Sequence, residues 1–162
     1  MQINRFLFQN HQLEMEEDID FSLADLDQNL IRKISNTHVK MKAHEYEDLI
    51  IADFEISTDI VGVCSYTLQD VPLHLKFKDS LEFSNEVQDD DEIFYEEKPI
   101  FNLDPYILGL IIAETPTKII KKGAKLPSSG KGYRVLSEDD YLKEKEEKTD
   151  SRWSKLDDIE IE

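Results

Sequence analysis

One cysteine and four histidines are the side chains of this sequence best suited to nucleophilic or metal chemistry. To act as a nucleophile, Cys64 would need a lowered pKa, because the thiolate rather than the thiol attacks. It ends a run of alternating apolar residues and lies on the apolar side of that run, where a thiol usually packs in the core. The histidines show no spacing typical of a metal site; they are His11, His38, His44 and His74. We therefore expect no catalytic residue, no metal ion or other cofactor, and no enzymatic activity.

Two short motifs resemble ligand-binding loops but lack parts that such loops need. The acidic run 89–92 has consecutive carboxylates, whereas a calcium loop needs alternating ligands and a glycine at its sixth position. Gly130-Lys131-Gly132 resembles the end of a phosphate-binding loop, but the spacing back to Gly123 is too long. Gly132 also replaces the Ser or Thr that binds magnesium in that loop. We therefore interpret neither motif as a ligand-binding loop. The chain also lacks the acid–base or metal constellation that a ribonuclease would need, and no small-molecule substrate is evident.

Charge is spread unevenly along the chain. The 36 acidic and 19 basic residues give a formal net charge of −17, which argues against a nucleic-acid binder that works by attraction at a distance. Residues 117–136, however, contain no acid, and acidic stretches lie on both sides of them. The bases in this segment are Lys118, Lys121, Lys122, Lys125, Lys131 and Arg134.

Two interpretations of the segment 117–136 stay open on this basis. Its lysines could simply keep a flexible, glycine-rich surface loop soluble. Alternatively, the segment forms a small patch that contacts RNA phosphates, where Tyr133 could stack on an unpaired base.

The elements that must position these segments are predicted from hydrophobic periodicity. Alternation of apolar and polar residues predicts a strand from Ile50 to Cys64, with further strands over 39–44, 71–78 and 13–21. A turn over Glu45–Asp48 and other short connections favour an antiparallel sheet.

Helices are predicted in three places. Ser22 and Asp25 resemble a capping box in front of an apolar stripe, which predicts a helix over 22–34. Asp104-Pro105 predicts the start of a buried helix that Pro116 ends, over 104–115. A third helix, polar on all faces, is expected over 138–148.

Together these patterns predict an α+β fold in which an antiparallel, curled β-sheet is packed by two helices. We expect one domain over 1–136, with an acidic loop at 84–98 and a basic loop at 117–136. An acidic C-terminal helix and loose tail would follow over 137–162.

No apolar run approaches the roughly 20 residues of a membrane span, and the N-terminus lacks the pattern of a signal peptide. With one cysteine, the composition fits a reducing cytosol, so we expect a cytoplasmic protein without membrane contact.

Three segments, in the same order and spacing, resemble the YceD family, bacterial and plastid proteins linked to accumulation of large-subunit ribosomal RNA. Residues 63–71 resemble the family's Cys-x-Arg-x-Leu signature, and 102–116 resemble its Asp/Asn-Leu-x-Pro helix that ends in a proline. Residues 127–136 resemble the segment that follows this helix in Gram-positive members. The matching signature positions are Cys64, Leu68, Pro105, Pro116 and Gly130.

The chain also departs from the family pattern. Tyr66 stands where the signature has arginine, and Thr67 stands where many members have a second cysteine. Leu108 and Gly109 replace acidic residues expected in the buried helix. Any contact that the family makes through those side chains is lost or relocated in this chain.

The resemblance implies a non-catalytic ribosome-biogenesis factor that acts on large-subunit ribosomal RNA, on a basic ribosomal protein, or on both. For an RNA contact we expect the six bases of 117–136, together with Tyr133, to be the binding residues. The alternative is an acidic chaperone that holds a basic large-subunit ribosomal protein and makes no RNA contact.

Overall fold

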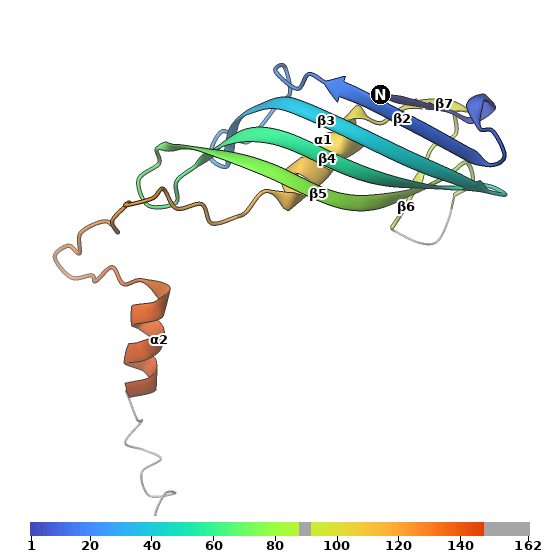
Figure 1. Ribbon diagram of the computed structural model, residues 1–162. Coiled ribbons are helices and arrows are strands. Elements are labelled where there is room, and N and C mark those ends of the chain that lie inside the picture. The colour runs from blue at the N-terminus through green and yellow to red at the C-terminus, as the bar shows by residue number, and fades with distance from the viewer. Residues whose placement is uncertain (88–91, 148–162) are drawn as a thin grey trace, which may run out of the picture.

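The structure is a computed structural model that describes residues 1–87 and 92–147 (Figure 1). Residues 88–91 of the expected acidic loop, and residues 148–162 of the expected tail, lie outside the described residues. The elements in chain order are β1 (Gln2–Asn4), a 3-10 turn η1 (Arg5–Leu7), β2 (Gln12–Ile19), β3 (Ile31–Tyr46), β4 (Leu49–Val63), β5 (Asp70–Ser84), β6 (Ile93–Tyr95), β7 (Ile100–Asn102), α1 (Asp104–Glu114) and α2 (Glu138–Glu147).

The four strands expected from period-two alternation are confirmed as β2 to β5. They lie side by side and antiparallel in a five-stranded sheet of order β2-β3-β4-β5-β6, which is open at both ends. β3 and β4 are joined by a turn of two residues, Glu47 and Asp48. β1 and β7, which alternation did not predict, form a separate antiparallel pair.

The sheet is mixed rather than purely antiparallel, so that part of the prediction is wrong. β6 runs parallel to the end of β5, with Phe83 opposite Phe94. The strand also lies inside the segment 84–98 that was expected to be an acidic loop. Aromatic packing holds Phe94 of β6 in place, because the rings of Phe94 and Phe83 both contact Tyr106 of α1 edge-on.

The helix expected over 22–34 is also wrong. That stretch is a series of turns followed by the first residues of β3, and Leu23 is 97% exposed. The carboxylate of Asp27 accepts the backbone N–H of Asn29 at 2.9 Å, a local bond that competes with a helix. Ile31 is buried as a strand residue instead. The apolar spacing of this stretch fits turns followed by a strand as well as it fits a helical stripe.

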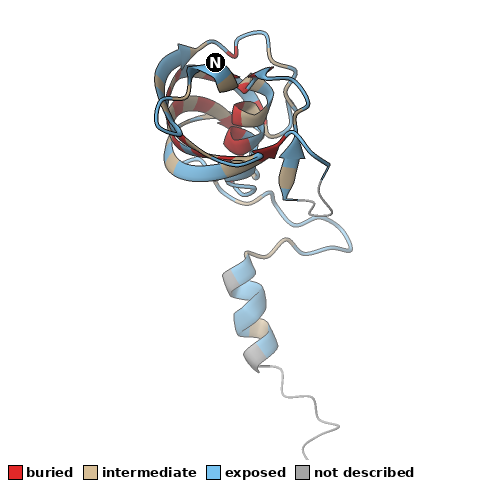
Figure 2. Ribbon diagram, turned by 90° about the vertical axis from the view of Figure 1, so that its right-hand side faces the viewer, coloured by how far each residue is buried: buried red, intermediate tan, exposed pale blue. Residues whose placement is uncertain are grey.

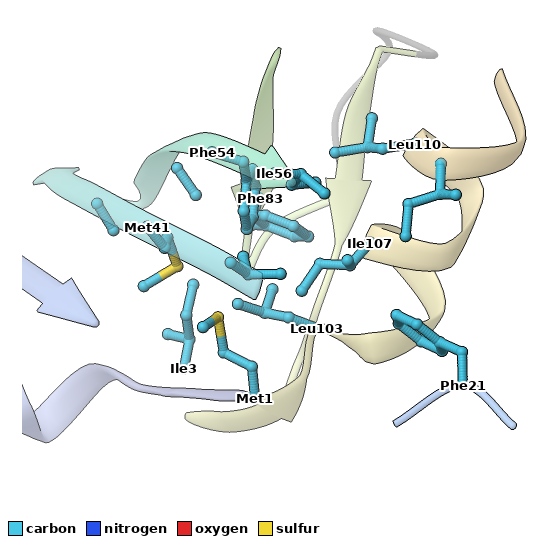
Figure 3. Packing of buried hydrophobic residues seen from close by; sticks show 14 of the residues in the cluster. Met1, Ile3, Phe21, Met41, Phe54, Ile56, Phe83, Leu103, Ile107 and Leu110 are labelled. Atoms are coloured by element: carbon cyan, nitrogen blue, oxygen red, sulfur yellow. The ribbon is translucent and has the colours of Figure 1, made fainter. Parts of the chain in front are cut away.

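The helix expected over 104–115 is confirmed as α1, and it is the helix that packs on the sheet. Its first turn contains Pro105, and it ends as Thr115 turns the chain. Figure 2 shows buried residues in α1 and in the strands of the sheet, and those of α1 belong to the same apolar cluster as those of the central strands. There, Ile107 and Leu110 approach Phe83 and Ile56 (Figure 3). The polar helix expected near 138–148 is confirmed as α2, and its last expected residue lies outside the described ones.

Candidate nucleic-acid interface

The segment 117–136, called the basic segment below, connects α1 to α2. It follows Pro116 and contains no helix or strand in the structure, only an isolated bridge between Gly130 and Tyr133. Gly123 and Gly132 have φ angles of 80° and 92°, a region in which side chains other than hydrogen are strained. Glycines therefore shape the two turns of this segment.

One end of the basic segment is anchored to the sheet by Ile119. This side chain is 4% exposed and packs against Gly62 of β4, where a Cβ atom would overlap Ile119 Cδ1. The carbonyl of Ile119 accepts the N–H of Ser65 at 2.7 Å, and its own N–H donates to Ser65 Oγ at 3.3 Å. An apolar contact and two hydrogen bonds thus hold Ile119, which lies between lysines in the sequence.

Cys64 takes part in the same anchor. Its side chain is fully buried, in keeping with its place on the apolar side of the strand, and the N–H of Lys121 donates to its Sγ at 3.3 Å. This hydrogen bond, with a second from the Thr67 side chain, lowers the pKa of the thiol to about 7. The N–H of Leu68, at a φ of 57°, donates to the Cys64 carbonyl at 2.8 Å. Residues 64–68 therefore form a turn whose structural role is to hold the basic segment.

The bases of the segment fall into two groups. Lys118 pairs with Glu138 of α2 at 3.1 Å, and Arg134 pairs with Glu144 at 2.6 Å. The ammonium of Lys121 donates to the side chain of Gln69 at 3.0 Å. These contacts are exposed, and exposed ion pairs contribute only up to about 1 kcal/mol, so an anionic ligand can displace them.

The second group comprises Lys122, Lys125 and Lys131. All three are exposed, and no ion pair joins them to another residue within 1–87 or 92–147. Tyr133 is 62% exposed and its ring lies against Gly130. Three cations and one aromatic ring are thus presented to solvent on a segment that has no carboxylate of its own.

Two other signature positions lie at the two ends of α1. Pro105 lies in the first turn, and Pro116 follows the last turn, where the basic segment begins. Sequence reasoning found the basic segment by its charge but missed its anchor. The available indication was the pair Ile119-Ile120, two apolar residues in a run of lysines.

Across 1–87 and 92–147, no group of three or more His, Cys, Asp or Glu side chains is placed to hold a metal ion. Within the same ranges, no helix is long and apolar enough to cross a membrane.

Comparison with known proteins relates most of the chain to a described family. Residues 52–160 match the family described as "Large ribosomal RNA subunit accumulation protein YceD". "Uncharacterized protein YlbN" of Bacillus subtilis (strain 168) is 30% identical over 148 residues, an alignment that covers 83% of this chain and 85% of that protein. No solved structure matches the chain.

Proposed function

The chain belongs to the YceD family, and we propose that it is a non-catalytic, cytoplasmic ribosome-biogenesis factor that supports the accumulation of large-subunit ribosomal RNA. The family description supports the ribosomal role.

In the proposed mechanism the basic segment contacts RNA directly and locally. Lys122, Lys125 and Lys131 bind phosphates, and Tyr133 stacks on an unpaired base. The observation that carries the proposal is the exposure of these three lysines, without an ion pair among the described residues, on an anchored segment free of acid. The net charge of −17 repels RNA from the rest of the surface, which keeps the contact weak and reversible.

A second candidate function is that of an acidic chaperone for a basic large-subunit ribosomal protein. The observation in its favour is the outward row of the edge strand β2, formed by Glu14, Glu16 and Asp18. All three are exposed, and the side chain of Asp18 is 86% exposed. Such a row can attract and shield a cationic partner.

The RNA contact is tested with two variants that lose the same charge. In the first, Lys122, Lys125 and Lys131 become glutamine; in the control, Lys33, Lys40 and Lys98, outside the segment, become glutamine. Binding to a single-stranded fragment of large-subunit ribosomal RNA is measured between about 50 and 200 mM salt. Loss of three phosphate contacts should reduce the slope of log K against log salt by about 2 in the first variant alone.

Equal slopes for the two variants would show that the basic segment does not bind RNA. If the wild-type chain also captures a basic ribosomal protein from nuclease-treated extract, the chaperone function is then favoured. If that capture depends on intact RNA, the RNA contact is favoured instead.

A further inference from the structure

The outward face of the sheet carries acidic and basic rows that alternate strand by strand. β2 contributes Glu14, Glu16 and Asp18, β3 contributes His38, Lys40 and Lys42, β4 contributes Asp53, Glu55 and Asp59, and β5 contributes His74, Lys76 and Lys78. The basic row of β3 thus has an acidic row on each side. The basic row of β5 has one only on the side of β4, because β6 pairs with no residue of β5 before Glu82.

Ion-pair distances differ between the two basic rows. On β3, Lys40 lies 3.1 Å from Glu16, and Lys42 lies 2.9 Å from Glu14. On β5, Lys76 and Lys78 share the single carboxylate of Glu55, at 3.4 and 3.5 Å. These two lysine side chains are 65% and 77% exposed. The β5 row therefore has cationic capacity that β4 does not use.

The backbone of β5 is also open on this side. The carbonyl of Ser84 accepts the N–H of Glu96, beyond β6, so the even-numbered residues of β5 direct their backbone groups away from β4. Pro72 is consistent with this direction, since it has no N–H to give to β4. Ser80 is consistent with it too, because its N–H donates to the Asp79 carboxylate at 2.8 Å.

The stretch of β5 between Pro72 and Ser80 is called the open edge below. By the same alternation it presents the backbone groups of His74, Lys76 and Lys78. In the part of the chain that the structure describes, no other strand pairs with them on this side. Figure 1 shows β6 beside only one end of β5.

An apolar row lies on the inner side of the same edge. Leu73, Leu75 and Phe77 pack against the core but are only partly buried, whereas Ile56 and Ile60 on the neighbouring strand β4 are buried almost completely. A further strand at the open edge would cover this row. Its inward residues would have to be apolar, and its outward residues would meet the β5 cations.

We propose that the open edge binds an extended segment of a partner protein in which acidic and apolar residues alternate, added to the sheet next to β5. Backbone hydrogen bonds would supply binding energy, and the alternation would supply specificity. β4 already shows that such a segment fits β5, because Asp53 and Glu55 face outward while Phe54 and Ile56 face inward.

The observations favour this occupant over two others. RNA would use the lysines but leave the backbone groups and the apolar row without partners. A second copy could offer its own acidic edge, β2, but two bodies that each carry a net charge of −17 repel one another. Lysines on an edge strand can also serve only to prevent association, and the test below includes that result.

The test uses the full chain and two synthetic peptides. One peptide has the sequence of residues 51–59 of β4, and its control carries lysine in place of the three acids, Asp53, Glu55 and Asp59. Binding is followed by the NMR shifts of the amide groups of β5. We expect the acidic peptide to bind at least tenfold more tightly than the lysine peptide, with the largest shifts at His74, Lys76 and Lys78. Equal affinities, or shifts elsewhere, would overturn the proposal and leave the lysines as guards against association.

Backbone pairing is separated from charge by two substitutions at one position. Lys76→Pro removes an N–H that faces the open edge, with the same parity as Pro72, and should weaken the acidic peptide at least tenfold. Lys76→Gln removes only the charge and should weaken it about threefold. Equal effects of the two would argue against an added strand.

A charge reversal keeps the proposal testable if Lys76→Pro does not fold. The pair Lys76→Glu and Lys78→Glu should invert the preference, so that the lysine peptide binds more tightly than the acidic one. An unchanged preference would contradict the proposed role of the lysines of β5.

If the wild-type chain self-associates in light scattering and Lys76→Pro abolishes this, the occupant is a second copy and the partner-protein proposal is wrong.

Discussion

Replacing Ile119 by alanine should release the basic segment while the sheet stays folded. Ile119 is almost fully buried, and its neighbour Ile120 is 46% exposed, so Ile120→Ala is a control of the same residue type one position away. Only the first substitution removes contacts with Gly62 and leaves a cavity under the segment.

The size of the effect follows from the atoms removed. Ile119→Ala deletes three buried carbon groups at about 0.8 kcal/mol each, before the cost of the cavity is added. A loss of about 2.5 kcal/mol is at the low end of the range of 2–5 kcal/mol for such substitutions. At 1.4 kcal/mol per factor of ten, opening of the segment should become about 50-fold more frequent or more. Because the segment lies outside the sheet, circular dichroism should show little change.

The single cysteine of the chain reports this opening. Cys64 is buried beneath Lys121, so iodoacetamide should reach it only when the segment opens. At pH 9 the opened thiol, with its ordinary pKa of 9.0, is half ionised, so the altered pKa changes the rate only about twofold. We expect alkylation to accelerate about 50-fold in Ile119→Ala and hardly at all in Ile120→Ala. Equal rates in the two variants would refute the anchor.

Three other predictions concern the sheet and its surface. Thr58→Val leaves the buried Thr37 hydroxyl without the partner it has at 2.7 Å, and should cost about 1–3 kcal/mol in urea unfolding, whereas adding Thr37→Val should restore part of the loss. The hydrogen bond to Asp18 raises the pKa of His38 above 6.5. Protonated His38 therefore stabilises the folded state below pH 6.5, and this stabilisation is lost as pH rises through the raised pKa. The unfolding free energy lost in His38→Gln should therefore shrink with rising pH, and a constant loss would contradict the pairing. Phe83→Ala should cost about 3–5 kcal/mol in urea unfolding, because the ring is fully buried among three aromatic neighbours, and a cost below about 1 kcal/mol would argue against this packing.

Long alternating strands were predictable, while the short and ambiguous elements were not. From Ile50 to Cys64 the alternation fits only a half-buried strand, and β4 lies there. Leu23 and Ile34, by contrast, fit both a helical stripe and a turn followed by a strand, and tertiary pairing with β4 decided for the strand. β6 has three residues, too few for a period, and the contact of Phe94 with Tyr106 of α1 leaves no local pattern in the sequence.

The same contrast holds for the candidate interface. Counting charges locates the basic segment, because no acid interrupts it. Its attachment depends on Ile119 meeting Gly62 and Ser65, residues more than fifty positions earlier in the chain, which no local pattern reveals. The alternating charge rows were equally hidden, since they require the register of four strands.

Crosslinking in cells, followed by identification of both the RNA and the crosslinked peptide, tests the central proposal most directly. We predict crosslinks between large-subunit ribosomal RNA and the basic segment, at or near Lys122, Lys125, Lys131 and Tyr133, and their loss when the three lysines become glutamine. Crosslinks to a basic ribosomal protein without RNA, or RNA crosslinks confined to other parts of the chain, would contradict it.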